Sequence, residues 1–477
     1  LPTQIGSWFA RLFHIHYTSV ALNNLNTEIT ESMPHLEFDE RNSDHWHYQA
    51  QTTLQKKLAT QFNTKIAKNV ILFIGDGMSI TTLAATRAYI GQQHGFLGEE
   101  TKLNFEEFPF TGLAKTYCVD NNVADSACSG TAYMTGVKAN SGTIGVTAAV
   151  NRGNCSGLIA WAQAADKRTG IVTTTRVTHA TPASSYAHSA DRRWECDSDI
   201  PPKNQHCQDI ALQLVRGRVV LGGGVYGSRS DEVDLIKEWL ITKKSYGLKP
   251  KYVNSKDQLH NIDGSETNSI LGLFSADHMP YHLEAPIEDP GLDEMTKKAI
   301  EILSNNEDGF FLFVEGGRID TAHHETKARK ALDETAEFAK AVDVALSMVN
   351  LDETLIIVTS DHSHTMSYSG YNRRGSDILG FADKLPYMIL SYANGPGYKP
   401  EVDNHRHDLL LDNIADLNYT YPSMVPMNRE THGGEDVAVF AQGPWSHLFT
   451  GNYEQNYIPH AVAYAACIGP RRKACFT

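Results

Sequence analysis

The chain has 477 residues, of which 41% are hydrophobic and 21% are charged, so it holds enough apolar material for a large folded core and is not a disordered protein. Its formal net charge of -14 argues against nucleic acid or an anionic membrane surface as a partner, because binding to such surfaces needs an excess of Lys and Arg. No run approaches the roughly 18 apolar residues that a membrane-spanning helix needs.

The cysteines and the glycosylation triplets point to an oxidising compartment. The seven cysteines do not form Cys-x-x-Cys pairs, which argues against a structural zinc ribbon, and their odd number leaves at least one thiol unpaired. Asn154 and Asn418 each begin an Asn-x-Ser/Thr triplet, the acceptor for N-glycosylation. We therefore expect an extracellular protein, secreted or anchored to the outer cell surface, with membrane contact only through a lipid anchor that this sequence does not show.

The first 61 residues carry no chemistry that we can identify. Residues 1–37 form an N-terminal arm, for which a processing remnant or a flexible arm is favoured over a partner-binding helix. The spacing of Trp46, Leu54 and Leu58 predicts an amphipathic helix over residues 39–61.

Five apolar runs then have the composition of buried parallel strands. Residues 69–74 lead to Asp76, 170–175 to His179, 218–221 to three glycines, 310–314 to Glu315 and 354–358 to Asp361. Helical stretches such as residues 327–348 lie between them, so we predict an α/β fold with a large, doubly wound, mostly parallel central sheet flanked by helices. Ligands bind beyond the carboxyl ends of the strands in such sheets, and the charged residues of this chain collect there.

Ser126 is the candidate nucleophile. It follows Asp125 among small residues and precedes a helix-compatible run, so it is expected at a helix N-terminus, whose free N–H groups attract anions. Taken alone, an Asp-Ser pair before an apolar helix is first of all an N-cap. The metal-binding residue types elsewhere in the chain favour the catalytic interpretation.

Carboxylates and imidazoles with metal-ligand spacing follow the predicted strands. Asp320 and His324 are four residues apart, hence on one face if helical, and Asp361-His362 adds a second pair. Asp76, Glu315 and His432 are predicted at the same sheet edge, where mixed oxygen and nitrogen ligands suit zinc and an oxygen-only corner suits magnesium. Two divalent ions about 4 Å apart can stabilise the attacking and leaving oxygens of a phosphoryl transfer.

An arginine is expected beside such a site, because its planar fork matches phosphate. Arg192 and Arg193 follow the strand end at His179, although the pair could equally belong to a solvated turn.

Together these residues resemble the animal alkaline phosphatases. The resemblance covers about residues 39–475 in the same order and rests on Gly75-Asp76-Gly77-Met78, Asp125-Ser126-Ala127, Thr178-His179-Ala180-Thr181-Pro182-Ala183, Val314-Glu315-Gly316-Gly317-Arg318-Ile319-Asp320, Asp361-His362-Ser363-His364 and Glu430-Thr431-His432-Gly433-Gly434-Glu435-Asp436. It implies a homodimeric phosphomonoesterase with two zinc ions and one magnesium ion per subunit. It also implies a core in two parts, residues 38–366 and 430–477, around a crown-like insertion at the dimer interface, residues 367–429.

The resemblance further implies a role for each matching residue. The first zinc, which activates the hydrolytic water, would take Asp320, His324 and His432. The second zinc, which activates Ser126, would take Asp76, Asp361 and His362. Magnesium would take Asp76, Thr181 and Glu315 with His179 close by, and Arg192 rather than Arg193 matches the phosphate-binding arginine. The family's disulfides would be Cys155 with Cys207 and Cys467 with Cys475.

Two positions depart from the family. Thr321 stands where relatives often have a histidine beside the zinc ligand Asp320. Ser275 follows Phe274 where mammalian relatives have glutamate, so a calcium site is doubtful, although Asp289 matches one of its ligands.

The leading hypothesis is hydrolysis of phosphate monoesters through a phosphoserine at Ser126, with Arg192 holding the phosphoryl group in both steps. A phosphodiesterase on the same fold is the runner-up, although such relatives generally lack the arginine and magnesium positions. A cell-surface binding protein with a dead site is the non-enzyme alternative, and metal binding without turnover would support it.

Overall fold

The computed structural model describes residues 40–149, 155–217, 220–224, 229–382, 386–401 and 403–470. The chain divides into two compact units, Leu1–Thr60 and Gln61–Thr477. In the first unit, α2 (Ser43–Ala59) confirms the helix predicted for residues 39–61. None of its residues is buried, so the predicted amphipathic spacing does not produce a covered face in this unit. The arm of residues 1–37 lies outside the described residues.

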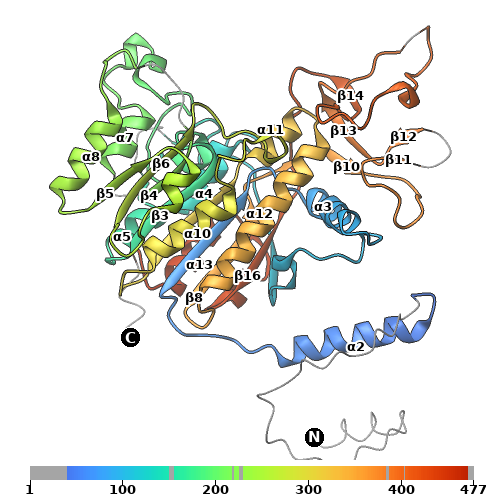
Figure 1. The fold of residues 1–477 in the computed structure, drawn as a ribbon, viewed down its shortest axis with the longest axis horizontal. Helices are drawn as coiled ribbons and strands as arrows, with labels where there is room; N and C mark the ends of the chain where they lie inside the picture. The colour runs from blue at the N-terminus through green and yellow to red at the C-terminus, as the bar shows by residue number, and fades with distance from the viewer. Residues whose placement is uncertain are drawn as a thin grey trace, which may run out of the picture. The chain divides into compact units, whose positions relative to one another are not determined.

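The second unit is built on one ten-stranded sheet in the order β17-β2-β16-β8-β1-β7-β3-β4-β6-β5 (Figure 1). Neighbouring strands are parallel, except that β16 runs antiparallel to both β2 and β8. The predicted class, a mostly parallel α/β sheet, is thus confirmed. The strands are β1 (Asn69–Gly75), β2 (Phe110–Lys115), β3 (Arg168–Arg176), β4 (Val220–Gly224), β5 (Pro250–Val253), β6 (Ser269–Ser275), β7 (Phe310–Gly316), β8 (Thr354–Ser360), β16 (Val437–Gln442) and β17 (Gly451–Glu454).

Helices cover both faces of this sheet, because alternate side chains of its central strands are apolar on both sides. Val70 and Leu72 of β1 belong to the buried cluster that includes residues of α4, α5, α7, α8 and α13, whereas Ile71 and Phe73 belong to the cluster with α3, α10 and α12. Figure 1 shows α10 and α12 side by side on their face. The helices are α3 (Ile80–Gln93), α4 (Ser126–Thr135), α5 (Leu158–Gln163), α6 (Ala180–Ala183), α7 (Ile210–Arg216), α8 (Leu235–Ser245), α9 (Lys256–His260), α10 (Leu292–Leu303), α11 (Arg318–His324), α12 (Ala328–Met348) and α13 (Tyr457–Ala465).

The register of the central strands aligns their carboxyl ends. Gly75, the last residue of β1, pairs with Gly316 of β7 on one side and with Ser360 of β8 on the other. The next residues along the chain, Asp76 and Asp361, therefore leave the sheet side by side. This register produces the edge at which the sequence predicts the ligands.

The segment predicted as an insertion contains smaller sheets. One has the order β10-β13-β14, and β11 pairs with β12. Their buried residues form a cluster with residues of α3 and α12, separate from the clusters on the main sheet. The short strands are β9 (Ser363–His364), β10 (Met366–Tyr368), β11 (Phe381–Ala382), β12 (Tyr387–Met388), β13 (Leu390–Gly395), β14 (Ser423–Pro426) and β15 (His432–Gly433), of which β9 and β15 pair with each other.

Candidate active site

Ser126 is the first residue of α4, as predicted. The side chain of Asp125 caps the helix by accepting a hydrogen bond from the Cys128 amide (3.2 Å). All ten residues of α4 are buried, so the helix is fixed in the core with its N-terminus toward the sheet edge. The hydroxyl oxygen of Ser126 lies 3.3 Å from Nε2 of His362. Both the N-cap and the catalytic interpretation of the Asp-Ser pair are therefore compatible with one geometry.

His362 stands between two buried carboxylates that follow neighbouring strands. Its Nε2 lies 3.4 Å from Oδ1 of Asp76 and 3.2 Å from Oδ2 of Asp361. The Gly77 amide donates to the other oxygen of Asp361 (3.0 Å), which fixes the direction of that carboxylate. Three groups predicted to bind one cation thus converge in front of the Ser126 hydroxyl.

A second convergence is centred on Asp320 of α11. Its Oδ1 lies 3.4 Å from Nε2 of His324, one helical turn later, and 3.3 Å from Nε2 of His432. The two imidazole nitrogens are themselves 3.1 Å apart. The spacing of four residues therefore brings Asp320 and His324 to one face as predicted, and the pairing of β15 with β9 brings His432 to them.

The third predicted group surrounds Glu315 at the end of β7. Thr173 and Thr175 donate to Oε2 of Glu315, the latter at 3.1 Å, and Thr181 donates to Oδ2 of Asp76 (3.4 Å). Within the described residues, two buried carboxylate oxygens here have no hydrogen-bond partner: Oδ1 of Asp76 and Oε1 of Glu315. Buried polar atoms are rarely left unpaired, so these atoms are available to a ligand.

The electrostatics of this edge favour bound cations. Burial and the neighbouring carboxylate of Asp361 raise the pKa of Asp76 well above its usual range, and burial raises the pKa of Glu315 to about 7. Burial also holds the pKa of His362 well below its usual range, so the imidazole is neutral and offers a lone pair. Crowded buried carboxylates and neutral imidazoles are the donor set that divalent cations need. The residues therefore fit the metals that the sequence predicts.

Arg192 and Arg193 have different surroundings. Arg192 donates through Nη1 to Oδ2 of Asp125 (2.9 Å) and through Nη2 to Nε2 of His179 (2.9 Å). Because arginine only donates, His179 must accept at Nε2 and carry its proton on Nδ1. The side chain of Arg193 is 84% exposed and pairs with Asp191. Of the two, the structure brings Arg192 to the Ser126 helix and leaves Arg193 in solvent.

Two residues that were not assigned a role support Asp320. His364 donates from Nε2 to Oδ1 of Asp320 (2.8 Å), and its Nδ1 lies 2.5 Å from Oε2 of Glu430. Glu430 also accepts from the Thr365 amide (2.7 Å). Both residues lie in motifs that the chain shares with the family, but their spacing in the sequence does not reveal that they contact one another. Thr321 lies beside Asp320 on α11 with a half-buried side chain.

The cysteines differ from the expected pairing. Cys118 and Cys128 form a disulfide with a Cα–Cα distance of 5.8 Å. The structure does not join Cys155 to Cys207, so the bridge that the family resemblance implies is not formed there; Cys155 directly follows residues outside the described part. Cys467 is disulfide-bonded, and its expected partner Cys475 lies outside the described residues.

One of the two glycosylation candidates lies in the described part of the chain. Asn418 is exposed, and its Oδ1 accepts a hydrogen bond from Lys330 (2.9 Å). Asn154 lies outside the described residues.

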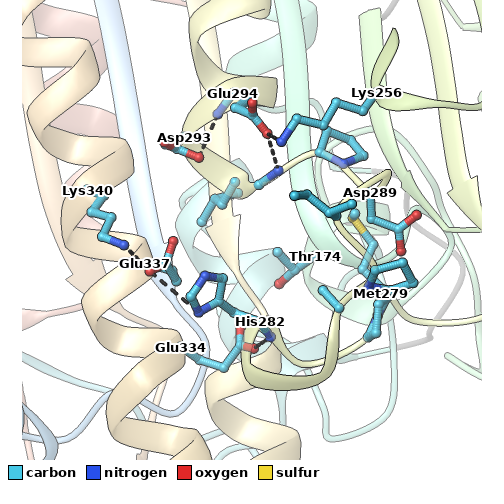
Figure 2. Close-up of a pocket in the computed structure, with 17 residues that line it drawn as sticks. Thr174, Lys256, Met279, His282, Asp289, Asp293, Glu294, Glu334, Glu337 and Lys340 are labelled. Atoms are coloured by element: carbon cyan, nitrogen blue, oxygen red, sulfur yellow. Dashed lines mark hydrogen bonds and ion pairs between the residues drawn. The ribbon is translucent and has the colours of Figure 1, made fainter. Parts of the chain in front are cut away.

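A separate cavity of about 480 Å³ includes Asp289, the one residue that matches the family's calcium site (Figure 2). Lys256 pairs with Glu294 on its wall (2.8 Å), and Lys340 pairs with Glu337. Of the carboxylate and imidazole groups that could hold a metal in the described part of the chain, none includes Asp289.

Comparison with known proteins decides the family. A family model for alkaline phosphatase matches residues 67–468. The tissue-nonspecific alkaline phosphatase of Mus musculus is 45% identical, with 91% of each chain covered, and the membrane-bound alkaline phosphatase of Bombyx mori is 44% identical over 91% of this chain and 87% of that protein. The chain belongs to the alkaline phosphatase family.

This membership confirms the predicted enzyme class. Alkaline phosphatases hydrolyse phosphate monoesters, so the chain is a phosphoric monoester hydrolase. The solved alkaline phosphatase of the Antarctic bacterium TAB5 has the same fold, with a TM-score of 0.62 and 26% identity over 84% of this chain and 99% of that chain. The Thermus thermophilus enzyme, at 23% identity and a TM-score of 0.64, agrees in fold.

Proposed function

We propose that this alkaline phosphatase works through a phosphoserine formed on Ser126. The observation that carries the proposal is the 3.3 Å separation between the Ser126 oxygen and Nε2 of His362, which itself lies within 3.4 Å of the Asp76 carboxylate and 3.2 Å of the Asp361 carboxylate. The positive end of the α4 helix dipole favours an anion in front of the serine. The hydroxyl, the ligand set and the helix terminus therefore face one point.

We propose two zinc ions and one magnesium ion per subunit. The first zinc would be held by Asp320, His324 and His432. The second zinc would be held by Asp76, Asp361 and His362, and the magnesium by Asp76, Thr181 and Glu315 beside His179. When bound, these cations supply Lewis acidity that stabilises the attacking and leaving oxygens. Mixed donors at the first two groups and oxygen donors at the third support this division.

The chain's own residues then account for two displacement steps. The Ser126 oxygen loses its proton and forms a bond to phosphorus, while the bond from phosphorus to the alcohol oxygen breaks and that oxygen takes up a proton. A water oxygen next loses a proton and attacks the phosphorus, and the bond from phosphorus to the Ser126 oxygen breaks, which releases inorganic phosphate and restores the serine hydroxyl. Arg192, held by Asp125, would donate two parallel hydrogen bonds to the non-bridging oxygens in both steps.

The test has three measurements on one preparation. An acid-quenched reaction with an aryl phosphate monoester should yield a phosphopeptide that contains Ser126. Metal analysis should give two zinc ions and one magnesium ion per chain, and the aryl monoester should be hydrolysed much faster than the matching diester. A faster diester reaction, or turnover without a trapped phosphoserine, would contradict the proposal.

We also propose a homodimer located outside the cell, with residues 367–429 as a crown-like part of its interface. Leu411 (80% exposed) and Met424 (81% exposed) leave apolar surface on that segment, and disulfides persist in oxidising compartments. No helix in the described ranges is long and apolar enough to cross a bilayer. Sedimentation of the purified chain should give twice the monomer mass, and glycan mapping should find Asn154 and Asn418 modified.

A further inference from the structure

Residues 119–125 form the last part of the connection from strand β2 to the catalytic helix α4 and contain no helix or strand. The first four of these residues are exposed. The last two contact the active site: the Ala124 carbonyl accepts from Nδ1 of His432 (2.7 Å), and the Asp125 carboxylate accepts from Arg192 (2.9 Å). An irregular, partly exposed segment therefore holds two functional side chains.

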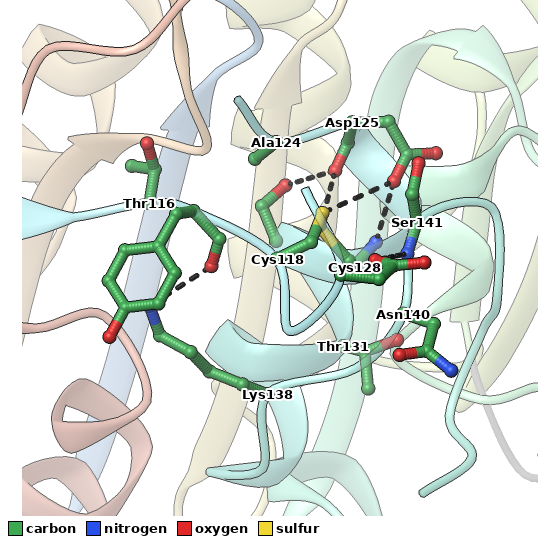
Figure 3. Close-up of a disulfide and its surroundings, with 12 residues drawn as sticks. Thr116, Cys118, Ala124, Asp125, Cys128, Thr131, Lys138, Asn140 and Ser141 are labelled. Carbon is green, nitrogen blue, oxygen red and sulfur yellow. Dashed lines mark hydrogen bonds between the residues drawn. A yellow bond between two sulfur atoms is a disulfide. The ribbon is translucent and has the colours of Figure 1, made fainter. Parts of the chain in front are cut away.

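A disulfide closes this segment into a loop. Cys118 immediately precedes it, and Cys128 lies in the first turn of α4, ten residues later. Both cysteines are almost completely buried. Figure 3 shows the Asp125 carboxylate directly beside the two sulfurs. Its Oδ1 lies 4.0 Å from Sγ of Cys118 and accepts the Cys128 amide, so both half-cystines contact the same carboxylate oxygen.

The other contacts of Asp125 lead to the phosphate-binding arginine. The Gly142 amide donates to both carboxylate oxygens of Asp125 (3.1 Å each), and the Gly142 carbonyl accepts from the Arg192 amide (2.8 Å). Arg192 is thus held through its backbone and its side chain by groups that meet at Asp125. Burial alone would raise the pKa of Asp125, but Arg192 and the Gly142 amide outweigh it and lower the pKa, which keeps the carboxylate charged.

At the start of the loop, the hydrogen bonds go to residues that lie outside α4. The Val119 amide donates to the Ala139 carbonyl (3.0 Å), and the Asp120 side chain accepts from the Ser141 amide (2.8 Å). These hydrogen bonds are exposed to competition from water, whereas the covalent link is not. A cross-link limits the positions that a loop can adopt, and a site that binds phosphate benefits from such preorganisation.

We propose that the Cys118–Cys128 disulfide is a positioning element of the active site, which holds Asp125 and, through it, orients Arg192 for phosphate. The inference rests on the proposed role of Arg192. It is separable from the phosphoserine proposal, because every variant below except the Ser126 reference keeps the nucleophile and the predicted metal ligands.

The test compares Cys118→Ala/Cys128→Ala with the wild type and with Cys196→Ser. Cys196 is a matched control because it is also buried and its Sγ already makes a hydrogen-bond contact with Asp199, which serine can keep. We expect the paired variant to raise KM and the phosphate inhibition constant about 10-fold, less than the roughly 100-fold that a 1 Å misplacement can cost. We expect kcat to change less, and Cys196→Ser to behave as the wild type.

A double-mutant cycle with Arg192→Ala separates positioning from general destabilisation. In the Arg192→Ala background, loss of the disulfide should change KM by no more than about twofold, because the group that it positions is already gone. Equal, multiplicative losses in both backgrounds would overturn the proposal. Hydrogen exchange should speed up in residues 119–125 of the paired variant, and unchanged exchange there would also overturn it.

Two further measurements test whether the disulfide exists and whether its loss affects the metal site. Bound zinc should be unchanged in the paired variant. If a loss of zinc accounts for the whole loss of activity, the proposal is wrong, because the loop would then act on the proposed zinc ligand His432 and not on Arg192. Peptide mapping of the active wild type without reduction should link Cys118 to Cys128, and free thiols at both would overturn it even if no variant folds. Failure of the phosphoserine proposal would appear elsewhere, as wild-type turnover without trapped phosphate and as turnover that survives Ser126→Ala.

Discussion

Arg192→Ala should damage catalysis far more than Arg193→Ala, although the two arginines are adjacent. Arg192 is three-quarters buried, and both of its terminal nitrogens are fixed, at 2.9 Å from Asp125 and 2.9 Å from His179. Arg193 is 84% exposed and pairs only with its near neighbour Asp191 in the contacts of the described chain. Only Arg192 is preorganised to meet a phosphoryl group beside Ser126.

The expected loss of activity follows from the hydrogen bonds that Arg192 would make to the phosphoryl group. Each hydrogen bond to a charged group contributes about 1.5–3 kcal/mol, and a guanidinium can make two to a phosphoryl group. Water and the proposed metals would replace part of that, so we expect a loss of about 2–4 kcal/mol in transition-state stabilisation, or about 30- to 1,000-fold in kcat/KM. Arg193→Ala should change kcat/KM by about twofold at most, as is usual for an exposed side chain.

The assay is the steady-state hydrolysis of an aryl phosphate monoester, with phosphate as product inhibitor, for the wild type and both variants. Arg192→Lys is the matched control for charge, because lysine keeps the positive charge but cannot bind phosphate bidentately; it should fall between the wild type and Arg192→Ala. Equal losses for the two alanine variants, or a larger loss for Arg193→Ala, would refute the assignment of Arg192.

Three further outcomes are expected. Ser126→Ala should abolish the trapped phosphoenzyme and most turnover while metal content stays at the wild-type level, and an unchanged kcat would remove Ser126 from the mechanism. Thr321→His should tighten magnesium or phosphate binding by about 10-fold, because it adds a donor beside the Asp320 ligand; titrations that agree within error for both forms would show that residue 321 faces away from the site. Peptide mapping without reduction should find Cys155 and Cys207 unlinked to each other, as in the structure; a linked Cys155–Cys207 peptide would instead support the pairing that the family resemblance implies.

Much of the proposed site could be predicted from the sequence because its proposed metal ligands follow buried strands. The apolar runs before Asp76, Glu315 and Asp361 predict parallel strands, and β1, β7 and β8 are those strands. Parallel strands place their carboxyl ends at one edge, so the residue after each run is placed without knowledge of the strand order. The four-residue spacing of Asp320 and His324 likewise reports a single helical face.

The strand order and the contacts between side chains that are distant in sequence became known only from the tertiary structure. β1 lies between β7 and β8, which begin more than 240 residues later in the chain, and β16 enters the same sheet antiparallel. The contact of His364 with Glu430, the Cys118–Cys128 bridge and the hydrogen bonds of Arg192 to Asp125 and His179 also depend on which side chains meet after folding.

The physical reason is the distance along the chain over which each kind of interaction acts. Burial and backbone preference act over one strand or one helical turn, so composition and spacing record them directly in the sequence. The direction of an arginine side chain or the partner of a cysteine is set by packing between elements that are distant in sequence, and no local pattern encodes that packing. The sequence by itself therefore determined which residues could reach the sheet edge, and the fold determined which of them touch.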